Sequence, residues 1–354
     1  MAKREPTVRR ATVKRVSIWI TAAVVASFAV QATGPSVGAV VEWEFVEESV
    51  SLGMSGVSPH VEKVAGGDRV WRSGVMPAGT AVSLCTDAGA CTSETLTATG
   101  AGAVVDYTVA QAPSGLRAYF KRIDPSSNTR AVYSAPCTTA DCLSFGAATI
   151  TSMGMQVSKD VKAWGVPDPV RLPDGRVRIH IVESPVPGKC TEKIASYISS
   201  DGISFTKESG WRLEGGYGDT EVLRAKDGDW VMILADIACT ASNNQKLFVT
   251  TSIDGLKWAE PQVLTGAGEF KLDPTGYEVS TNVFRIYYAA SVSANPSIKR
   301  GIMRIKETPA GGVGVTKTPT ATTPASKSKS ITCVKGKTVR KVTGTTCPKG
   351  FKKK

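Results

Sequence analysis

Four acidic residues that can transfer protons lie where short extended segments of the chain begin. They are Asp168, the nearby pair Asp219 and Glu221, and Asp273. Two carboxyl groups that flank a substrate can act as proton donor and as base or nucleophile, which is what hydrolysis of a glycosidic bond requires. The opposing interpretation is that each Asp only makes local hydrogen bonds at a turn or strand end. Both interpretations stay open at this level.

Three further side chains accompany the acids. Trp164 and Tyr217 precede two of the extended segments, where an aromatic ring can stack on a sugar face or close a channel by packing. His60 can act as a base or ligand, or can make a structural hydrogen bond. No metal site is predicted, because neither His60 nor His180 has a second ligand near it in the sequence. The candidates are therefore, for catalysis, Asp168, Glu221 and Asp273, and, for substrate binding, Trp164, Tyr217, Asp219 and His60.

The segments that must position these residues repeat along the chain. A short apolar strand, a tight turn and a second strand rich in Arg and aromatic residues recur five times, with turns near Gly66, Gly115, Gly175, Gly228 and Asn282. Glycine and asparagine both tolerate the positive φ that such a turn needs. A second turn, as in Ser200–Phe205 and Ser252–Trp258, follows in phase with the first. Each repeat thus contains four short strands and no helix.

Four-stranded repeats of about this length are typical of propeller blades. The predicted fold class is all-β, a five-bladed β-propeller over residues 40–306. The fifth repeat ends after a third strand near Ile298–Ile305, whereas Val40–Phe45 is an alternating strand without a partner in the first repeat. We predict that this N-terminal strand completes the last blade and removes an open sheet edge.

Two motifs resemble known families. The turns Ser200–Phe205 and Ser252–Trp258 resemble the Asp-box of sialidases, with one residue missing between the Ser and the aromatic residue. The stretch Trp164–Val170, followed by Pro173–Arg178, is similar to the inner strand pair of five-bladed glycosidases of the arabinanase and xylosidase group, glycoside hydrolase family 43. The resemblance covers residues 40–306.

This resemblance implies roles for the acids. It makes Glu221 the proton donor, Asp273 or Asp168 the base, and the remaining Asp the group that tunes the pKa of the donor. The family takes its base from the first inner strand, where this chain has Ser58 and His60 instead of Asp. A binding propeller without catalysis is therefore the alternative.

The basic charge of the protein is concentrated at its two ends. The formal net charge is +12, but residues 1–32 carry +5 and residues 308–354 carry +11, which leaves −4 on the rest. An acidic body lacks the Lys- and Arg-rich surface that phosphate binding needs, so no nucleic-acid partner is expected. Residues 1–32 combine basic residues, an apolar run and small residues, as secretory signal peptides do. Cleavage is predicted after Ala32 or Ala39; the alternative is an uncleaved anchor, for which the run is short.

Eight cysteines fit an exported, disulfide-bonded protein. Zinc is the less favoured explanation, because no C-x-x-C pair is present. The expected disulfides join neighbours in sequence or in adjacent blades: Cys85 with Cys91, Cys137 with Cys142, Cys190 with Cys239, and Cys333 with Cys347.

The C-terminal region differs in composition from the body. Residues 307–330 are rich in Gly, Pro, Thr, Ser and Lys and are predicted to form a linker, and residues 331–354 are predicted to form a basic, disulfide-tied hairpin. The hairpin resembles short basic C-terminal hairpins of exported actinobacterial proteins, which implies retention on an anionic cell-envelope polymer. A solvated tail without a partner is the other interpretation.

Three functions remain open from the sequence. They are a secreted glycoside hydrolase, a non-catalytic propeller that binds glycan or protein at the cell surface, and an architectural envelope protein. The expected partner is a glycan or polysaccharide, the expected state a monomer, and the expected location secreted or cell-surface associated. No cofactor is expected, with a structural calcium ion in the central channel left open.

Overall fold

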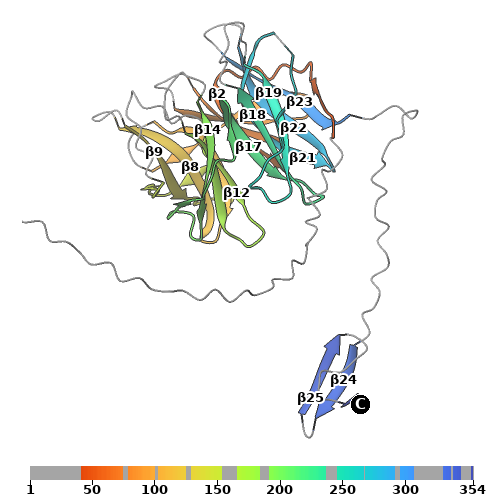
Figure 1. Cartoon of the computed structure of the whole chain (residues 1–354). Helices are drawn as coiled ribbons and strands as arrows, with labels where there is room; N and C mark the ends of the chain where they lie inside the picture. The colour runs from red at the N-terminus through yellow and green to blue at the C-terminus, as the bar shows by residue number, and fades with distance from the viewer. Residues whose placement is uncertain are drawn as a thin grey trace, which may run out of the picture. The chain divides into compact units, whose positions relative to one another are not determined.

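The chain folds into antiparallel sheets that follow one another along the sequence (Figure 1). The computed structural model describes residues 41–74, 79–99, 103–124, 129–153, 166–183, 191–236, 245–266, 268–291, 296–306, 330–335, 338–343 and 352–353. These residues form strands and turns, which confirms the predicted all-β class. In this part of the chain no helix is long and apolar enough to cross a membrane.

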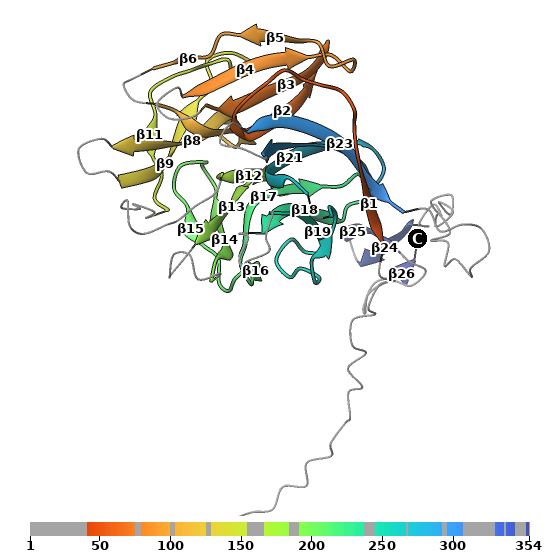
Figure 2. The same ribbon diagram turned by 90° about the horizontal axis from the view of Figure 1, so that it is seen from above.

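Five of the sheets are the blades of a propeller, as predicted (Figure 2). Their strands, from the inside outwards, are β2 (Val57–Val64), β3 (Gly67–Ser73), β4 (Thr80–Cys85) and β5 (Cys91–Glu94) in blade 1; β7 (Val105–Ala112), β8 (Gly115–Asp124), β9 (Thr129–Pro136) and β11 (Thr149–Ile150) in blade 2; β12 (Asp168–Arg171), β13 (Val177–Glu183), β14 (Lys193–Ser199) and β15 (Thr206–Lys207), with β16 (Leu213–Glu214) also on β14, in blade 3; β17 (Tyr217–Arg224), β18 (Trp230–Asp236), β19 (Leu247–Ser252) and β20 (Gln262–Val263) in blade 4; and β21 (Phe270–Ser280), β22 (Val283–Ser291), β23 (Ser297–Ile305) and β1 (Trp43–Glu47) in blade 5. The short strands β6 (Thr97–Ala98) and β10 (Ser144–Phe145) pair in parallel beside blade 2.

The N-terminal strand closes the ring, which confirms the sequence prediction. β1 pairs antiparallel with β23, with Trp43 opposite Ile305 and Glu47 opposite Gly301. Figure 2 shows the red β1 beside the blue β23. The strand begins at Trp43, three residues later than the Val40 expected from the alternating pattern. The two ends of the propeller are thus joined by backbone hydrogen bonds, so blade 5 has no unfinished edge.

The hydrophobic core lies mainly between blades. Each pair of neighbouring blades buries its own cluster of apolar side chains, for example Trp71 with Tyr107, Tyr119 with Ile179, Ile194 with Met232, Ile233 with Phe284, and Val70 with Tyr287. Because the sheets are covered on both faces, most residues of the second strands are buried, charged ones among them. Trp71 and Trp230 are buried packing residues.

An arginine on the second strand of a blade fastens that blade to the turn between the third and fourth strands of the next. Arg178 of blade 3 makes two hydrogen bonds to Glu208 (2.7 and 3.0 Å) and donates to Gly255 O of the blade 4 turn at 3.3 Å. Arg69 of blade 1 lies 4.0 Å from Asp141 in the blade 2 turn. The recurrence of Arg in the sequence therefore reflects packing between blades.

These receiving turns are stiffened in two ways. In blades 3 and 4 a Ser and an Asp side chain bond the turn backbone: Ser199 Oγ accepts from Gly202 N at 2.8 Å, and Asp201 Oδ1 accepts from Ser204 N at 2.7 Å. Ser252 and Asp254 repeat this pattern in blade 4. In blades 1 and 2 a disulfide joins the two sides of the turn instead. Charged acceptors and covalent bonds both fix a turn that would otherwise need to be ordered at an entropic cost.

Two of the four predicted disulfides are confirmed, Cys85–Cys91 and Cys137–Cys142. Cys190, Cys239 and Cys347 lie outside the described residues, and Cys333 is described only as part of a strand. The remaining two disulfides therefore stay predictions, as do the signal peptide with its cleavage after Ala32 or Ala39 and the linker.

The C-terminal residues form a small sheet of their own. β24 (Ser330–Lys335) pairs antiparallel with β25 (Thr338–Thr343), and β26 (Lys352–Lys353) pairs with the other edge of β24. The predicted two-stranded hairpin is thus extended by a third, very short strand, because the chain returns after residue 351 to the free edge of β24.

We expect Arg178→Met to lower the free energy of unfolding by about 3 kcal/mol, because it leaves the partly buried Glu208 carboxylate without its partner. Arg176→Met is the matched control: Arg176 also pairs with an acid, Asp174, but both side chains are about half exposed, so little change is expected. Urea denaturation of both variants measures the difference. Equal stability of the two variants would contradict a stabilising role for Arg178.

Candidate functional site

The five inner strands each place one side chain at the same register position, here called the inner ring. His60 lies opposite Trp71 of the second strand. The equivalent residues of blades 2 to 5 are Thr108, Asp168, Glu221 and Thr275, opposite Tyr119, His180, Ile233 and Tyr287. Neighbouring inner strands contact one another around the axis. Asp168 and Glu221, which the sequence analysis predicts as catalytic, therefore occupy equivalent positions in adjacent blades.

A second set of residues, the bulge ring, precedes the inner ring by two positions. In blades 1, 2, 4 and 5 the first strand contains a bulge at this point, and the bulged residue has a positive φ of 44–53°: Ser58, Asp106, Asp219 and Asp273. Asp tolerates this backbone conformation better than most residues. The bulge ring thus places three acids, from blades 2, 4 and 5, beside the inner ring.

The inner ring connects the blades to one another. Its side chains accept hydrogen bonds from the backbone of the following blade, at the residue just after the ring position. These hydrogen bonds run from Val109 N to His60 Nε2 (3.2 Å), from Val222 N to Asp168 Oδ2 (2.8 Å), from Gly276 N to Glu221, and from Val61 N to Thr275 Oγ1 (3.3 Å). A buried backbone N–H needs a partner, so these acceptors have a structural role besides any chemistry.

The connection between blades 2 and 3 shows why the ring residues differ. In blade 3 the residue after the ring position is Pro169, which has no N–H to donate. At the ring position of blade 2 lies Thr108, whose hydroxyl donates to Pro167 O of blade 3 at 2.9 Å. The direction of the hydrogen bond is reversed, but the two blades remain linked.

Asp168 and Glu221 are both buried, with 4% and 9% of their surface exposed. Burial raises the pKa of Glu221 to about 8, against the hydrogen bonds from Gly276 N and Thr275 that lower it. Burial, and then the charge of Glu221, raise the pKa of Asp168 well above its usual value. At neutral pH Glu221 therefore keeps a proton that it can donate, as a general acid must.

His180 lies next to this pair without being charged. Its Nδ1 is 3.6 Å from Asp168 Oδ2, but the side chain is fully buried. Burial, and the nearby positive charges of Arg178 and Arg212, lower the pKa of His180 well below its usual value. The contact is therefore between a neutral imidazole and a carboxyl group, and it leaves Asp168 without a counter-ion.

Asp219 and Asp273 form a second carboxyl pair in the bulge ring. Their side chains are hydrogen-bonded to each other, and Asp273 Oδ2 also accepts from Ser58 N at 2.9 Å. Burial raises the pKa of both groups, and the charge of Asp219 raises that of Asp273 further. Two adjacent carboxyl groups cannot both ionise easily, so the pair holds one proton between them.

A buried lysine adjoins this second pair. Lys121, from β8, is 6% exposed and lies 3.2 Å from Asp106 Oδ2. Its positive charge lowers the pKa of Asp219, whereas the charge of Asp106 raises it. Lys121 therefore offsets part of the negative charge that three acids bring to the bulge ring.

His60 takes the place that an acid occupies in blades 3 and 4. Its side chain is 8% exposed, and burial lowers its pKa to about 4, so the ring is neutral. Because Nε2 accepts a hydrogen bond from Val109 N, the proton of the neutral ring lies on Nδ1. His60 thus links blades 1 and 2, and its predicted part in substrate binding stays a prediction.

Tyr217 is the first residue of β17 and is only partly buried. Its ring packs edge-on against Phe248, with 5.3 Å between the ring centres, and belongs to the cluster between blades 3 and 4. This is the packing alternative considered for it, and a role in binding a sugar stays a prediction. Trp164 lies outside the described residues.

The sequence analysis missed Asp106, Lys121, Thr108 and Thr275, and it named Ser58 only as a residue that stands where the family has its base. A signal for most of them exists in the repeat: Asp106-Tyr107-Thr108, Asp219-Thr220-Glu221 and Asp273-Pro274-Thr275 share one pattern, which Ser58-Pro59-His60 and Val166-Pro167-Asp168 continue. Aligning the five repeats on the bulge would have found it. Among the described residues, no group of three or more His, Cys, Asp or Glu side chains is arranged to hold a metal ion.

Known proteins resemble this chain in structure only. No protein-family model and no curated protein sequence matches it. Similar solved structures include a thermostable family-43 glycoside hydrolase (12% identity, TM-score 0.55, covering 74% of this chain and 96% of that one), an endo-arabinase from Bacteroides thetaiotaomicron (11%, 0.54, 74% and 99%) and a GH62 hydrolase in complex with xylotriose (10%, 0.52, 74% and 96%).

The similarity confirms the fold that the inner-strand motif predicts. The chain has the five-bladed propeller architecture found in these glycoside hydrolases, and it covers nearly their whole length. Identities of 10–12% establish the fold alone.

We expect the free energy of unfolding to fall as the pH rises from 5 to 8. Glu221 has a pKa of about 8 in the fold and about 4.5 ordinarily, so the folded protein holds a proton that the unfolded chain releases. Its contribution is fully present below the ordinary pKa and is lost as the pH rises through the folded pKa. Glu221→Gln should reduce this loss by on the order of 3 kcal/mol.

Urea denaturation at pH 5 and pH 8 measures this effect. Glu214→Gln, whose side chain is 57% exposed, is the control and should keep the wild-type pH dependence. Asp168, Asp219 and Asp273 have raised pKa values as well, so some dependence should remain in Glu221→Gln. An undiminished dependence in that variant would show that Glu221 ionises normally in the fold.

Proposed function

We propose that this protein is a secreted, carbohydrate-active propeller that hydrolyses a glycosidic bond at the axis of its ring. The observation that carries the proposal is the buried carboxylic acid of Glu221, which holds its proton near neutral pH beside acids from the neighbouring blades. The fold shared with glycoside hydrolases supports a glycan as substrate, and one of these structures holds xylotriose.

The protonation of the two carboxyl pairs supports distinct roles. Glu221 is the proton donor, because it is protonated at neutral pH. Asp168 accompanies it, and the charge of Glu221 raises the pKa of Asp168. The Asp219–Asp273 pair shares one proton and keeps one negative charge, which lies on Asp219, because the charge of Asp219 raises the pKa of Asp273. Asp219 therefore serves as the base, the role that the resemblance gives to Asp273 or Asp168.

A non-catalytic propeller that binds glycan or protein is the second candidate function, and a specific observation favours it. Blade 1 brings Ser58 to the position where blades 2, 4 and 5 bring Asp, and His60 to the position where blades 3 and 4 bring acids. Asp168 and Glu221 also accept backbone hydrogen bonds that hold the ring together. In this function the acids are structural, and the propeller binds its ligand without transferring a proton.

We also propose that the protein is exported and kept at the cell surface by its basic end. The signal-like residues 1–32 support export, and the charge of +11 on residues 308–354 supports attraction to an anionic envelope polymer. The acidic body would not contribute to this attraction.

Hydrolysis of a panel of aryl glycosides and of plant and microbial polysaccharides tests the catalytic proposal. We expect turnover by the mature protein and a loss of about 100-fold or more in Glu221→Gln, because general acid catalysis typically contributes this much. Glu214→Gln, remote from the inner ring, should keep full activity.

Binding of the same polysaccharides separates the two candidate functions. Turnover that survives in Glu221→Gln would overturn the assignment of the proton donor. Binding without turnover of any substrate would favour the non-catalytic propeller. If the protein shows neither turnover nor binding, both candidate functions are wrong and an architectural role is the one that remains.

Removal of residues 331–354 should weaken retention on an anionic polysaccharide resin and shift elution to lower salt, because screening acts on the charges of this segment. Hydrolysis or binding of neutral glycans by the propeller should be unchanged. Equal elution of the full-length and truncated proteins would contradict a retention role for this segment.

A further inference from the structure

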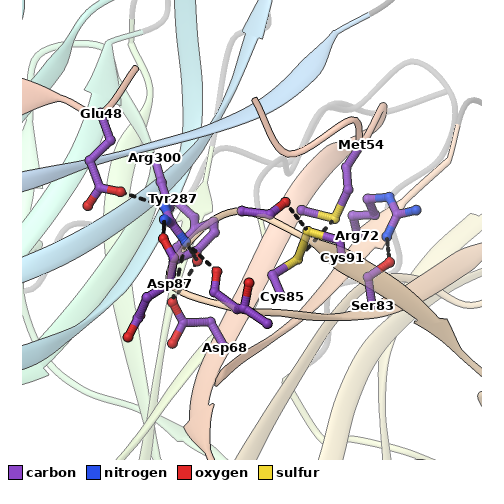
Figure 3. The surroundings of a disulfide bond; sticks show 12 residues. Glu48, Met54, Asp68, Arg72, Ser83, Cys85, Asp87, Cys91, Tyr287 and Arg300 are labelled. Atoms are coloured by element: carbon purple, nitrogen blue, oxygen red, sulfur yellow. Dashed lines mark hydrogen bonds and ion pairs between the residues drawn. A yellow bond between two sulfur atoms is a disulfide. The ribbon is translucent and has the colours of Figure 1, made fainter. Parts of the chain in front are cut away.

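The turn between β4 and β5 of blade 1 is held by the Cys85–Cys91 disulfide (Figure 3). Within it Thr86 N donates to Ala90 O and Gly89 N donates to Thr86 O, both at 2.9 Å. The turn lies at the seam where blade 1 meets blade 5, the last blade to be completed. The Cys85–Cys91 disulfide therefore lies where the ring closes, whereas Cys137–Cys142 lies in the blade 2 turn, at the seam between blades 1 and 2.

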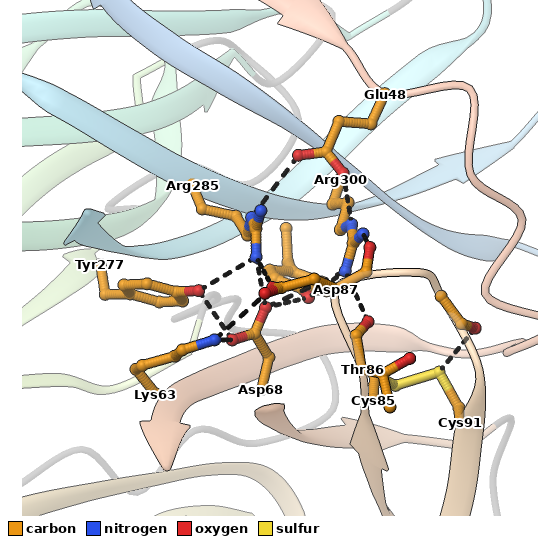
Figure 4. Close-up of polar contacts among 12 residues, drawn as sticks. Glu48, Lys63, Asp68, Cys85, Thr86, Asp87, Cys91, Tyr277, Arg285 and Arg300 are labelled. Atoms are coloured by element: carbon orange, nitrogen blue, oxygen red, sulfur yellow. Dashed lines mark hydrogen bonds and ion pairs between the residues drawn. A yellow bond between two sulfur atoms is a disulfide. The ribbon is translucent and has the colours of Figure 1, made fainter. Parts of the chain in front are cut away.

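Two arginines of blade 5 bind this turn. Arg300, which is 1% exposed, donates to Thr86 O at 3.3 Å and also to Asp87 O. Arg285 donates to Asp87 Oδ1 at 2.5 Å. Figure 4 shows both guanidinium groups directed at the turn. The geometry of the turn thus decides whether these two cations have their acceptors.

A buried carboxylate below the turn ties the same elements together. Asp68 of blade 1 has no exposed surface. It accepts hydrogen bonds from Tyr277 Oη and Tyr287 Oη, both at 2.7 Å, from Arg285 at 3.2 Å and from Lys63 at 3.0 Å. Despite burial, these partners keep the pKa of Asp68 below its usual value. The seam is therefore a charged network that depends on exact positions.

The segment that follows the closing strand β1 also packs against this turn. Glu48 accepts from Arg300 Nε at 2.7 Å, and Met54 Sδ lies 3.9 Å from Cys85 Sγ. A side chain at Gly89 would collide with Val50, so the turn and the segment pack closely. The turn consequently contacts blade 5 and the chain leaving β1 at once.

We propose that the Cys85–Cys91 disulfide is a redox-sensitive latch on the closure of the propeller. A dithiol reductant cleaves the S–S bond: its thiolate attacks one sulfur, its second thiol resolves the mixed disulfide, and two protons and two electrons end on Cys85 and Cys91 while the reductant becomes a disulfide. The opened turn no longer holds the acceptors of Arg300 and Arg285 in place. The seam between blades 1 and 5 then loosens, and β1 with β23 opens.

Hydrogen exchange of the full-length protein, followed by mass spectrometry, tests the latch. We expect Cys85→Ser/Cys91→Ser to exchange about tenfold faster in β1 and β23, with β13 and β14 of blade 3 unchanged, because local opening exposes only the amides it frees. Cys137→Ser/Cys142→Ser is the matched control and should leave β1 and β23 protected. Equal protection of the seam in the two variants and the wild type would overturn the proposal.

Reduction of the folded wild-type protein covers the case in which the variant does not fold. Dithiothreitol is added in steps, free thiols are alkylated, and modified cysteines are mapped at each step. The latch requires that exchange in β1 and β23 rise together with alkylation of Cys85 and Cys91. Full alkylation of both with the seam still protected would overturn it. The outcome is independent of any activity on glycans.

Discussion

The arrangement depends on one hydrogen bond that recurs around the axis, from the backbone of one inner strand to a side chain of the preceding blade. Five sheets that only packed through apolar faces could slide past one another, since apolar contact has no direction. The N–H groups of Val61, Val109 and Val222 prevent this sliding, because each must find its acceptor once it is buried. An acceptor is therefore required at one register position of blades 1, 3, 4 and 5, where the inner ring supplies His60, Asp168, Glu221 and Thr275, whereas Thr108 of blade 2 donates instead.

This constraint concentrates the acids where chemistry could also use them. A carboxyl group placed at the axis to accept a backbone hydrogen bond is buried, and burial raises its pKa toward the range of a general acid. Structural demand thus produces the same features that indicate a catalytic site. Glu221 and Asp168 fit both descriptions, and so does the Asp219–Asp273 pair, whose hydrogen bond joins blades 4 and 5 and which accepts from Ser58 N of blade 1. The amide of Gln keeps the acceptor and removes the acid, which is why that replacement separates the two roles.

The sequence predicts the blades well because their determinants are local. The turns at Gly66, Gly175 and Gly228 and the periodic strands need only neighbouring residues, and the unpaired strand at the N-terminus needs only a count of strands. The pairing of Asp219 with Asp273 and the approach of Lys121 to Asp106 depend on how bulges in different blades face one another. That register is set by the closed ring, so no single repeat contains it. Pro169 shows the same limit, since its missing N–H matters only through Thr108 of another blade.

The fastening arginines show how closure changes one repeat. Blades 1, 2, 3 and 5 carry Arg at the same position of the second strand, but blade 4 carries Val231. The turn that such an arginine would bind is missing in blade 5, because its fourth strand is β1 and arrives from the other end of the chain. An arginine buried there would have no acceptor, and an unpaired buried charge is costly. The last blade must therefore be secured from its other side, where Arg285 and Arg300 meet blade 1, and the exception at Val231 is a consequence of closing the ring with a strand from the N-terminus.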